Sequence, residues 1–150
     1  MSNKTCWIGW LLIGLWLPVV ASAAHPLAGS WRGVSHAVVP YLEEFFFYAE
    51  GSGCYRYALI SDATQGRAKC FEESQLIEKD GYFHLTLDDA ISFLLVLNSG
   101  GELSVVQIVE LTSIENVSLK STRFVKMVKD IDQTEPVWRS ELSPDCRLCQ

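Results

Sequence analysis

Along most of the chain, short runs of apolar and aromatic residues alternate with residues typical of turns. The clearest example follows the Asp80-Gly81 turn signal, after which Phe83, Leu85 and Leu87 occupy every second position. An apolar residue at every second position places one face of a β-strand against a core. The pattern therefore predicts an all-β domain. The predicted strands cover residues 31–37, 44–49, 54–60, 68–77, 82–87, 91–97, 102–111 and 117–128.

The predicted strands are joined mostly by short turns, which favours neighbours that run antiparallel. The simplest arrangement of about eight such strands is a single up-and-down barrel, because closure removes the exposed sheet edges. An open curved sheet or a sandwich is the alternative for the same strands. The alternation changes phase between Val105 and Val106 and again near Ser121-Thr122, which predicts β-bulges at these points.

Asp62–Gly66 is expected to be a turn. Two other segments have more than one interpretation. The first is Glu72–Gln75, which fits either a loop or one helical turn within a weak strand. Three consecutive Phe residues followed by Tyr48 favour a strand after Pro40. A helical stripe is the competing interpretation of that stretch. Its members would be Leu42, Phe45, Phe46 and Ala49.

The first residues have the pattern of an export signal. Lys4 precedes an unbroken apolar run that ends before Pro18, and Ala21-Ser22-Ala23 has the small residues that a signal peptidase requires. The apolar run is shorter than the about 20 residues that a membrane span needs, although an uncleaved anchor is the alternative. The sequence therefore predicts a signal peptide at 1–23, a barrel at 24–128 and a C-terminal tail at 129–150. We expect a periplasmic or secreted protein, with no membrane association after cleavage.

Composition limits both the architecture and the partners. With 150 residues, 49% hydrophobic and 20% charged, the chain suits one folded domain and is not disordered as a whole. The 18 acidic residues outnumber the 12 basic ones, for a formal net charge of −6. This balance argues against a general nucleic-acid binder, which needs a basic face. It suits a basic protein partner instead.

Four cysteines remain after the predicted signal peptide, namely Cys54, Cys70, Cys146 and Cys149. An even number in an exported chain indicates disulfides, and three connectivities are possible. The alternation places Cys54 and Cys70 on the outward face of neighbouring strands, which favours their pairing and leaves Cys146 with Cys149. The Cys-x-x-Cys spacing of the second pair also fits a thiol-redox protein. No second Cys/His pair is present to complete a zinc site.

The segment Gly29-Ser30-Trp31 opens the first predicted strand and resembles the Gly-x-Trp signature that begins lipocalin and lipocalin-like (calycin) barrels. The resemblance implies a barrel that Trp31 closes at one end, with a cavity for a small apolar ligand. The segment Glu50–Ala58 is similar to the Ser-Gly-rich, Arg-Tyr segment of small periplasmic barrel inhibitors of lysozyme. That likeness implies a protein-binding inhibitor or envelope-stress module that acts through its rim loops.

Chemistry-bearing groups are sparse and scattered. Neighbouring carboxylates on a strand point to opposite faces, so we expect the pairs to be solvated rim or turn residues. They are Glu43-Glu44, Glu72-Glu73 and Asp88-Asp89. No nucleophile elbow or phosphate-binding glycine loop occurs in the sequence. The three histidines, His25, His36 and His84, have no metal-ligand spacing. The sequence predicts no catalytic residue, no metal and no cofactor.

Aromatic residues are the stronger candidates for a site. Under the alternation, six of them face the barrel interior, where they would either contact a ligand or fill the core. These six are Trp31, Phe45, Phe47, Tyr55, Tyr57 and Phe83. The leading hypothesis is therefore an exported, non-enzymatic binding protein for a small apolar or amphipathic ligand. The inhibitor and the thiol-redox protein are the alternatives.

Overall fold

The regular structure is β-strand apart from one short 3-10 turn, within the residues that the computed structural model describes, which are 23–35, 39–112 and 118–131. No helix in these ranges is long and apolar enough to cross a membrane. The elements are β1 (Gly29–Ser35), β2 (Tyr41–Phe47), β3 (Gly53–Leu59), β4 (Asp62–Phe71), η1 (Glu73–Gln75), β5 (Leu76–Lys79), β6 (Tyr82–Thr86), β7 (Ile91–Leu97), β8 (Glu102–Thr112) and β9 (Ser118–Asp130).

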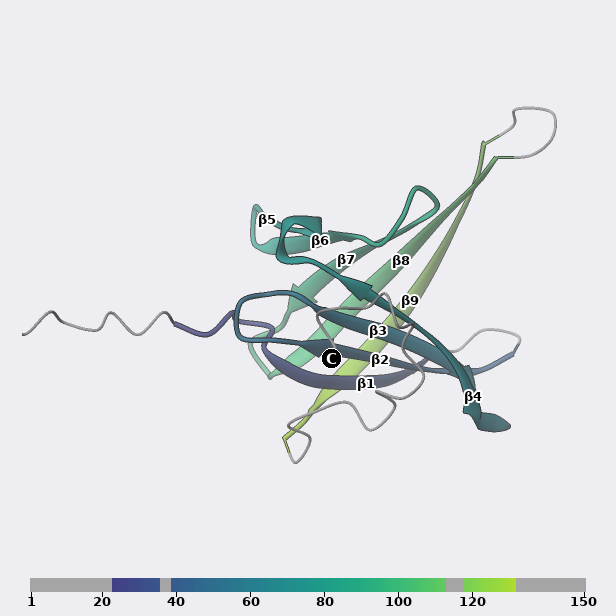
Figure 1. Ribbon diagram of the computed structural model, residues 1–150, viewed down its shortest axis with the longest axis horizontal. Helices are drawn as coiled ribbons and strands as arrows, with labels where there is room; N and C mark the ends of the chain where they lie inside the picture. Colours follow the sequence, from purple (N-terminus) through teal and green to yellow (C-terminus); the bar gives the residue numbers. More distant parts are fainter. Residues whose placement is uncertain (1–22, 36–38, 113–117, 132–150) are drawn as a thin grey trace, which may run out of the picture.

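All nine strands belong to one antiparallel sheet with the order β4-β3-β2-β1-β9-β8-β7-β6-β5. Strands that are consecutive in the sequence are paired, except β4 and β5, and β1 pairs with β9. The sheet curls so that β1 to β3 lie opposite β5 to β7 (Figure 1). The predicted all-β class and the antiparallel arrangement are confirmed. The predicted closure into a barrel of about eight strands does not occur, because the nine strands form a half-barrel with an unpaired seam between β4 and β5.

The seam arises because the segment predicted as one strand at 68–77 is divided into β4 and β5. The chain leaves β4 after Phe71, and the Gln75 side chain accepts a hydrogen bond from the Glu72 amide at 2.9 Å. The Gln75 amide group also donates to the Thr86 carbonyl oxygen at 2.7 Å, which fixes the turn beside β6. As a result β5 pairs with β6 rather than with β4. The turn predicted at Asp62–Gly66 is wrong, because these residues belong to β4.

The strand predicted after Pro40 is confirmed as β2, which includes Leu42 to Phe46, so the competing helical interpretation fails. The two predicted β-bulges are wrong. The register between β8 and β9 runs without a shift from Glu102 to Thr112, so neither predicted bulge occurs. The phase change at Val105-Val106 reflects apolar residues on both faces of β8, and a register shift lies instead at Ala58/Leu59 between β3 and β4.

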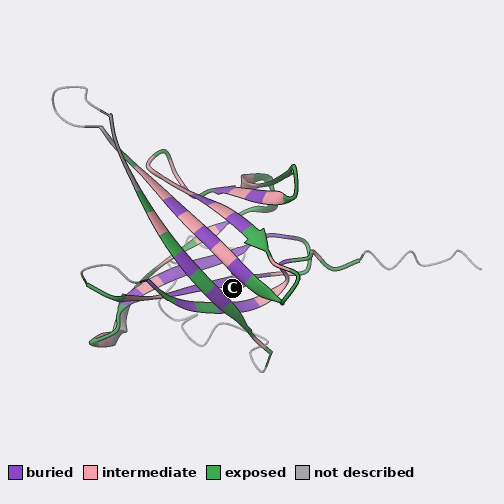
Figure 2. Cartoon of the chain, turned by 180° about the vertical axis from the view of Figure 1, so that it is seen from behind, coloured by how far each residue is buried: buried purple, intermediate pink, exposed green. Residues whose placement is uncertain are grey.

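The core lies on the concave face of the sheet. Burial alternates along β8 and β9, the two long diagonal strands of Figure 2. The Phe45 ring packs against three other rings, with centroid distances of 5.6 Å to Phe47, 4.8 Å to Tyr55 and 5.1 Å to Phe93. The Trp31 side chain is 1% exposed, and its indole Nε1 donates to the Leu27 carbonyl oxygen at 2.7 Å. This part of the interior is therefore filled by side chains.

Two glycines allow strands to approach closely. A Cβ atom on Gly33 would lie 2.5 Å from the Lys126 carbonyl oxygen and 2.8 Å from Val125 Cγ1. A Cβ atom on Gly53 would lie 2.0 Å from the Phe46 carbonyl oxygen. The backbone leaves no room for a side chain at either position, so the curvature of the sheet around β1 and β3 depends on glycine.

Candidate functional site

A pocket of about 520 Å³ lies at the unpaired seam, between the edge strand β4 and the turn that joins β6 to β7. It is partly open to solvent. Its lining residues come from β3, from β4 and from both sides of that turn. They are Tyr55, Tyr57, Gly66, Arg67, Ala68, Lys69, Leu87 and Ile91.

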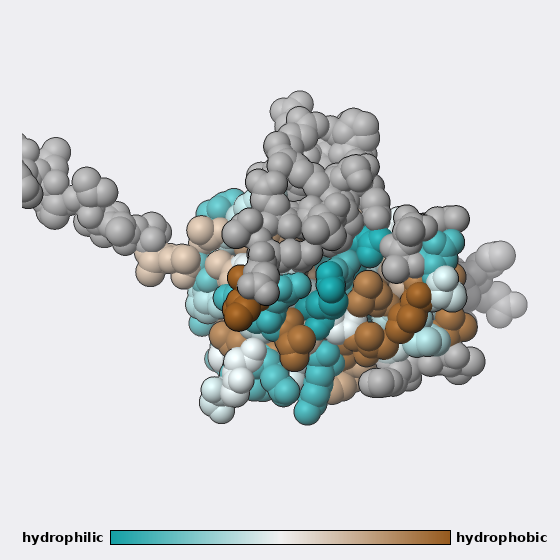
Figure 3. Space-filling view, turned by 90° about the horizontal axis from the view of Figure 1, so that it is seen from below, coloured by the Kyte–Doolittle hydropathy of each residue, from teal (hydrophilic) through white to brown (hydrophobic). Residues whose placement is uncertain are grey.

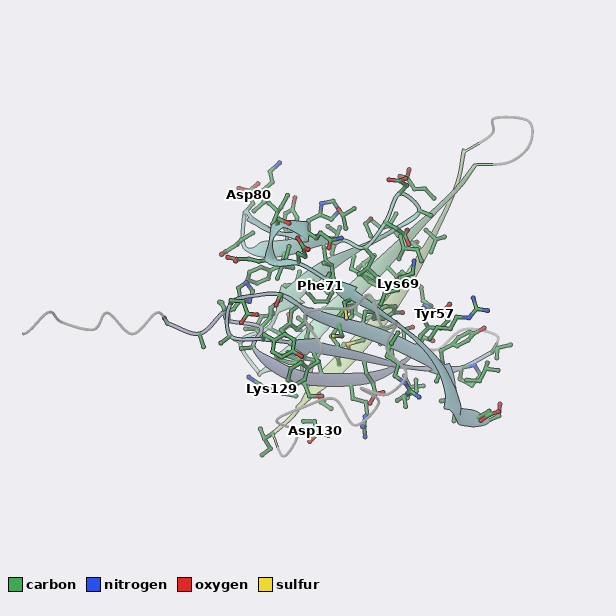
Figure 4. The ribbon with its side chains drawn as sticks, viewed as in Figure 1. Tyr57, Lys69, Phe71, Asp80, Lys129 and Asp130 are labelled. Carbon is green, nitrogen blue, oxygen red and sulfur yellow. The ribbon has the colours of Figure 1, made fainter. Side chains whose placement is uncertain are left out.

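One wall of the pocket is set by the register of two strands. Tyr55 is paired with Lys69, and Tyr57 with Arg67, so two aromatic residues of β3 and two cations of β4 lie side by side on one face of the sheet. Tyr57 and Lys69 lie on the same side of the molecule in Figure 4, away from Lys129 and Asp130. The facing wall is aliphatic, formed by Leu87 and Ile91. The pocket is therefore amphipathic.

An ion pair crosses the seam beside the pocket. The Lys69 ammonium group contacts Oδ2 of Asp88, and the two side chains are 51% and 32% exposed. Asp88 Oδ1 accepts hydrogen bonds from the amides of Ala90 at 2.9 Å and Ile91 at 2.8 Å. The hydrogen bond from Lys69 is the main reason that the pKa of Asp88 lies below its usual value. Asp88 thus fixes the turn between β6 and β7. It also links this turn to β4 through a side-chain contact and not through strand pairing.

A buried polar cluster lies behind Tyr55. The Glu43 side chain has no exposure to solvent, and its Oε2 accepts a hydrogen bond from the Tyr55 hydroxyl at 3.2 Å. Arg123 Nη2 on β9 lies 2.7 Å from Glu43 Oε1. Burial raises the pKa of Glu43, and the Arg123 charge opposes this rise. Burial also raises the pKa of Tyr55, so its hydroxyl stays protonated and serves as a donor.

The six predicted interior residues all belong to the core cluster or pack against it, and two of them also line the pocket. Tyr55 and Tyr57 line the pocket. The other four predicted residues pack in the main core cluster and do not line it. They are Trp31, Phe45, Phe47 and Phe83. The ring of Phe83 lies 5.2 Å from that of His25, whose pKa is lowered by burial.

Sequence reasoning missed most of the charged groups around the site. Glu43 and Glu44 are both buried, on opposite faces of β2, so the expectation of a solvated carboxylate pair is wrong here. Glu44 is held on the outer face by Arg32 Nη2 at 2.8 Å and Arg56 Nη1 at 3.0 Å. The alternation of Glu43 with Phe45 was the available signal for burial, because both belong to the inward face.

The structure confirms that the first predicted cysteine pair lies on neighbouring strands, but it does not show the bond. Cys54 and Cys70 lie directly opposite each other on β3 and β4, with their Sγ atoms 3.2 Å apart. That separation exceeds a disulfide bond of about 2.05 Å, so the bond stays a prediction. Cys146 and Cys149 lie outside the described residues, as does His36. Within the described ranges, no three His, Cys, Asp or Glu side chains are grouped so that they could hold a metal ion.

Comparison of the chain with protein-family models, with curated proteins and with solved structures finds no match.

Proposed function

We propose that the protein is an exported, non-enzymatic binding protein that takes a small apolar or amphipathic molecule in the seam pocket. The observation that carries the proposal is the pocket itself, whose volume of about 520 Å³ falls within the range of about 300–1,000 Å³ that is typical of ligand sites. Its lining combines aromatic and aliphatic surface with a few polar groups, which is the usual composition of such sites.

The location of the pocket supports the same proposal. The concave interior near Trp31 and Phe45 is filled, whereas the region around Tyr57 is open to solvent through the seam. Behind this region, Glu43 and Arg123 hold the Tyr55 hydroxyl in place, so the wall is preformed. A preformed site binds with a smaller loss of conformational entropy than a site that must order on binding.

Titration with the neutral apolar fluorophore N-phenyl-1-naphthylamine tests this function. We expect saturable fluorescence enhancement with one equivalent bound, and loss of most of this signal in Ile91→Trp, which fills the pocket. Ile77→Trp is the matched control, because Ile77 lies on β5 and is 57% exposed away from the pocket. The absence of saturable binding, or equal losses in both variants, would refute a ligand site at the seam.

A protein-binding inhibitor, implied by the likeness around Glu50–Ala58, makes a different prediction. It would act through exposed surface and would be insensitive to Ile91→Trp. Among the described residues, exposed apolar side chains on the outer face include Val34, Phe124 and Val128. The view from below shows apolar surface interspersed with polar surface (Figure 3).

A further inference from the structure

The charge of the pocket is opposite to the charge of the protein. The chain has 18 acidic and 12 basic residues, yet the charged side chains that line the pocket are Arg67 and Lys69. No carboxylate is among the lining residues, all of which belong to the described part of the chain. Both cations project from the inward face of β4, directly opposite Tyr57 and Tyr55. Basic groups at one wall of a pocket favour a ligand that carries negative charge.

The two cations differ in their partners. Lys69 is paired with Asp88 across the seam, so its charge is partly compensated. Arg67 is exposed, and no carboxylate of the described residues lies within ion-pair distance of its guanidinium group. A guanidinium group presents parallel N–H donors that match the two oxygens of a carboxylate or sulfonate. Arg67 is therefore the group that is available for an anionic headgroup.

The aliphatic wall formed by Leu87 and Ile91 determines the chemistry of the rest of the ligand. Leu87 is 9% exposed, and Ile91 packs against the main core cluster, so both present aliphatic surface that is held in place from behind. Neither side chain offers a hydrogen-bonding group. A flexible alkyl chain or a flat apolar ring would gain free energy by removing this surface from water.

We propose that the pocket is selective for anionic amphiphiles, such as an alkyl or aryl carboxylate or sulfonate. Arg67 binds the headgroup, with the neighbouring Tyr57 hydroxyl as a second donor, and Leu87 and Ile91 contact the apolar part. This inference rests on the proposed function, because it specifies the ligand class of the same pocket.

Isothermal titration calorimetry with three probes of equal chain length tests the inference. The probes are decanoate, decanol and decylammonium. The two ionic probes are used below the concentrations at which they form micelles, and decanol is used below its solubility limit. We expect decanoate to bind most tightly and decylammonium most weakly. Removal of the charge in Arg67→Gln should weaken decanoate binding about tenfold, which corresponds to about 1.4 kcal/mol, and leave decanol binding unchanged.

Lys126→Gln is the matched control, because it removes the same charge from an exposed position on the outer face of β9. It should leave all three affinities unchanged, and high salt should weaken decanoate binding to the unsubstituted protein more than decanol binding. Equal affinities for the three probes, together with sensitivity to Ile91→Trp, would overturn the anionic preference and leave the binding function intact. Failure of every probe to bind would overturn both.

Discussion

Glu43 Oε1 on β2 lies 2.7 Å from Arg123 Nη2 on β9, so the two ends of this ion pair come from strands that are separated in the sheet by β1. The carboxylate has no exposure to solvent and the guanidinium side chain is 24% exposed. On the inward face of β1, Gly33 lies directly opposite Glu43, and the Ser35 side chain hydrogen-bonds the Glu43 carboxylate. The pair therefore holds the curled sheet together from its inner side.

Removal of Arg123 is expected to be strongly destabilising. Arg123→Met leaves a buried carboxylate without its counter-charge, which costs about 3–5 kcal/mol of unfolding free energy. Urea denaturation followed by circular dichroism measures the loss. The double variant Glu43→Gln/Arg123→Met should recover most of the stability, because no uncompensated charge remains. A loss below about 1 kcal/mol in the single variant, as for an exposed pair, would contradict a structural role.

The raised pKa of Glu43 makes a prediction about pH. The folded state retains the Glu43 proton more strongly than the unfolded chain, where the pKa of Glu is about 4.3. The contribution of Glu43 to the unfolding free energy is therefore greatest below that value and falls as pH rises through the folded pKa. Denaturation midpoints across this pH window should show the fall in the unsubstituted protein and lose it in Glu43→Gln. The same slope in both proteins would show that another group is responsible.

Asp88 should act in the opposite direction. Its pKa is lowered in the folded state, mainly by the hydrogen bond from Lys69, so its stabilising contribution is present above the unfolded pKa of about 3.9. The contribution is lost as pH falls through the folded pKa. Asp88→Asn removes this pH dependence, and carboxyl NMR titration measures the Asp88 pKa directly. In Lys69→Gln that pKa should move upward, and an unchanged value would show that the amides of Ala90 and Ile91 are the main cause.

The close approach of β9 to β1 predicts the effect of a single methyl group. Gly33→Ala places a Cβ atom against the Lys126 carbonyl oxygen, which cannot move without disturbing the ladder. We expect a loss of about 1–3 kcal/mol of unfolding free energy. Gly100→Ala is the control, since a Cβ atom there meets nothing within 4 Å. Equal midpoints for the two variants in urea would contradict the crowding at Gly33.

The cysteine pair on β3 and β4 leads to a chemical prediction. Cys54 and Cys70 face each other in register, and we expect them to be oxidised to a disulfide in the exported protein. Peptide mapping under non-reducing conditions should recover the two cysteines in one cross-linked fragment. Cys54→Ser/Cys70→Ser should lower the unfolding free energy by about 3 kcal/mol, as expected for closure of a short loop. Two thiols that react freely with a maleimide in the native protein would contradict the pairing.

The strand content could be predicted because alternation and turn residues are local signals. Phe83, Leu85 and Leu87 are all buried, and the turn at Asp80-Gly81 has positive φ angles that suit its residues. The burial of Trp31 in the first strand likewise agrees with the inward face that the alternation predicts. These features depend on residues close in the sequence, so the sequence alone was sufficient for them.

The site depended on contacts between residues far apart in the sequence. Lys69 and Asp88 meet because β5 pairs with β6 and leaves β4 as an edge, and no local pattern states which strands stay unpaired. Glu43 and Arg123 meet because the ends of the meander join through β1 and β9. The sequence by itself determined strands, turns and inward faces, since these follow from the two-residue period of the backbone. Only the tertiary structure decided where the sheet opens, because the choice of strand partners depends on contacts between segments that are far apart in the sequence.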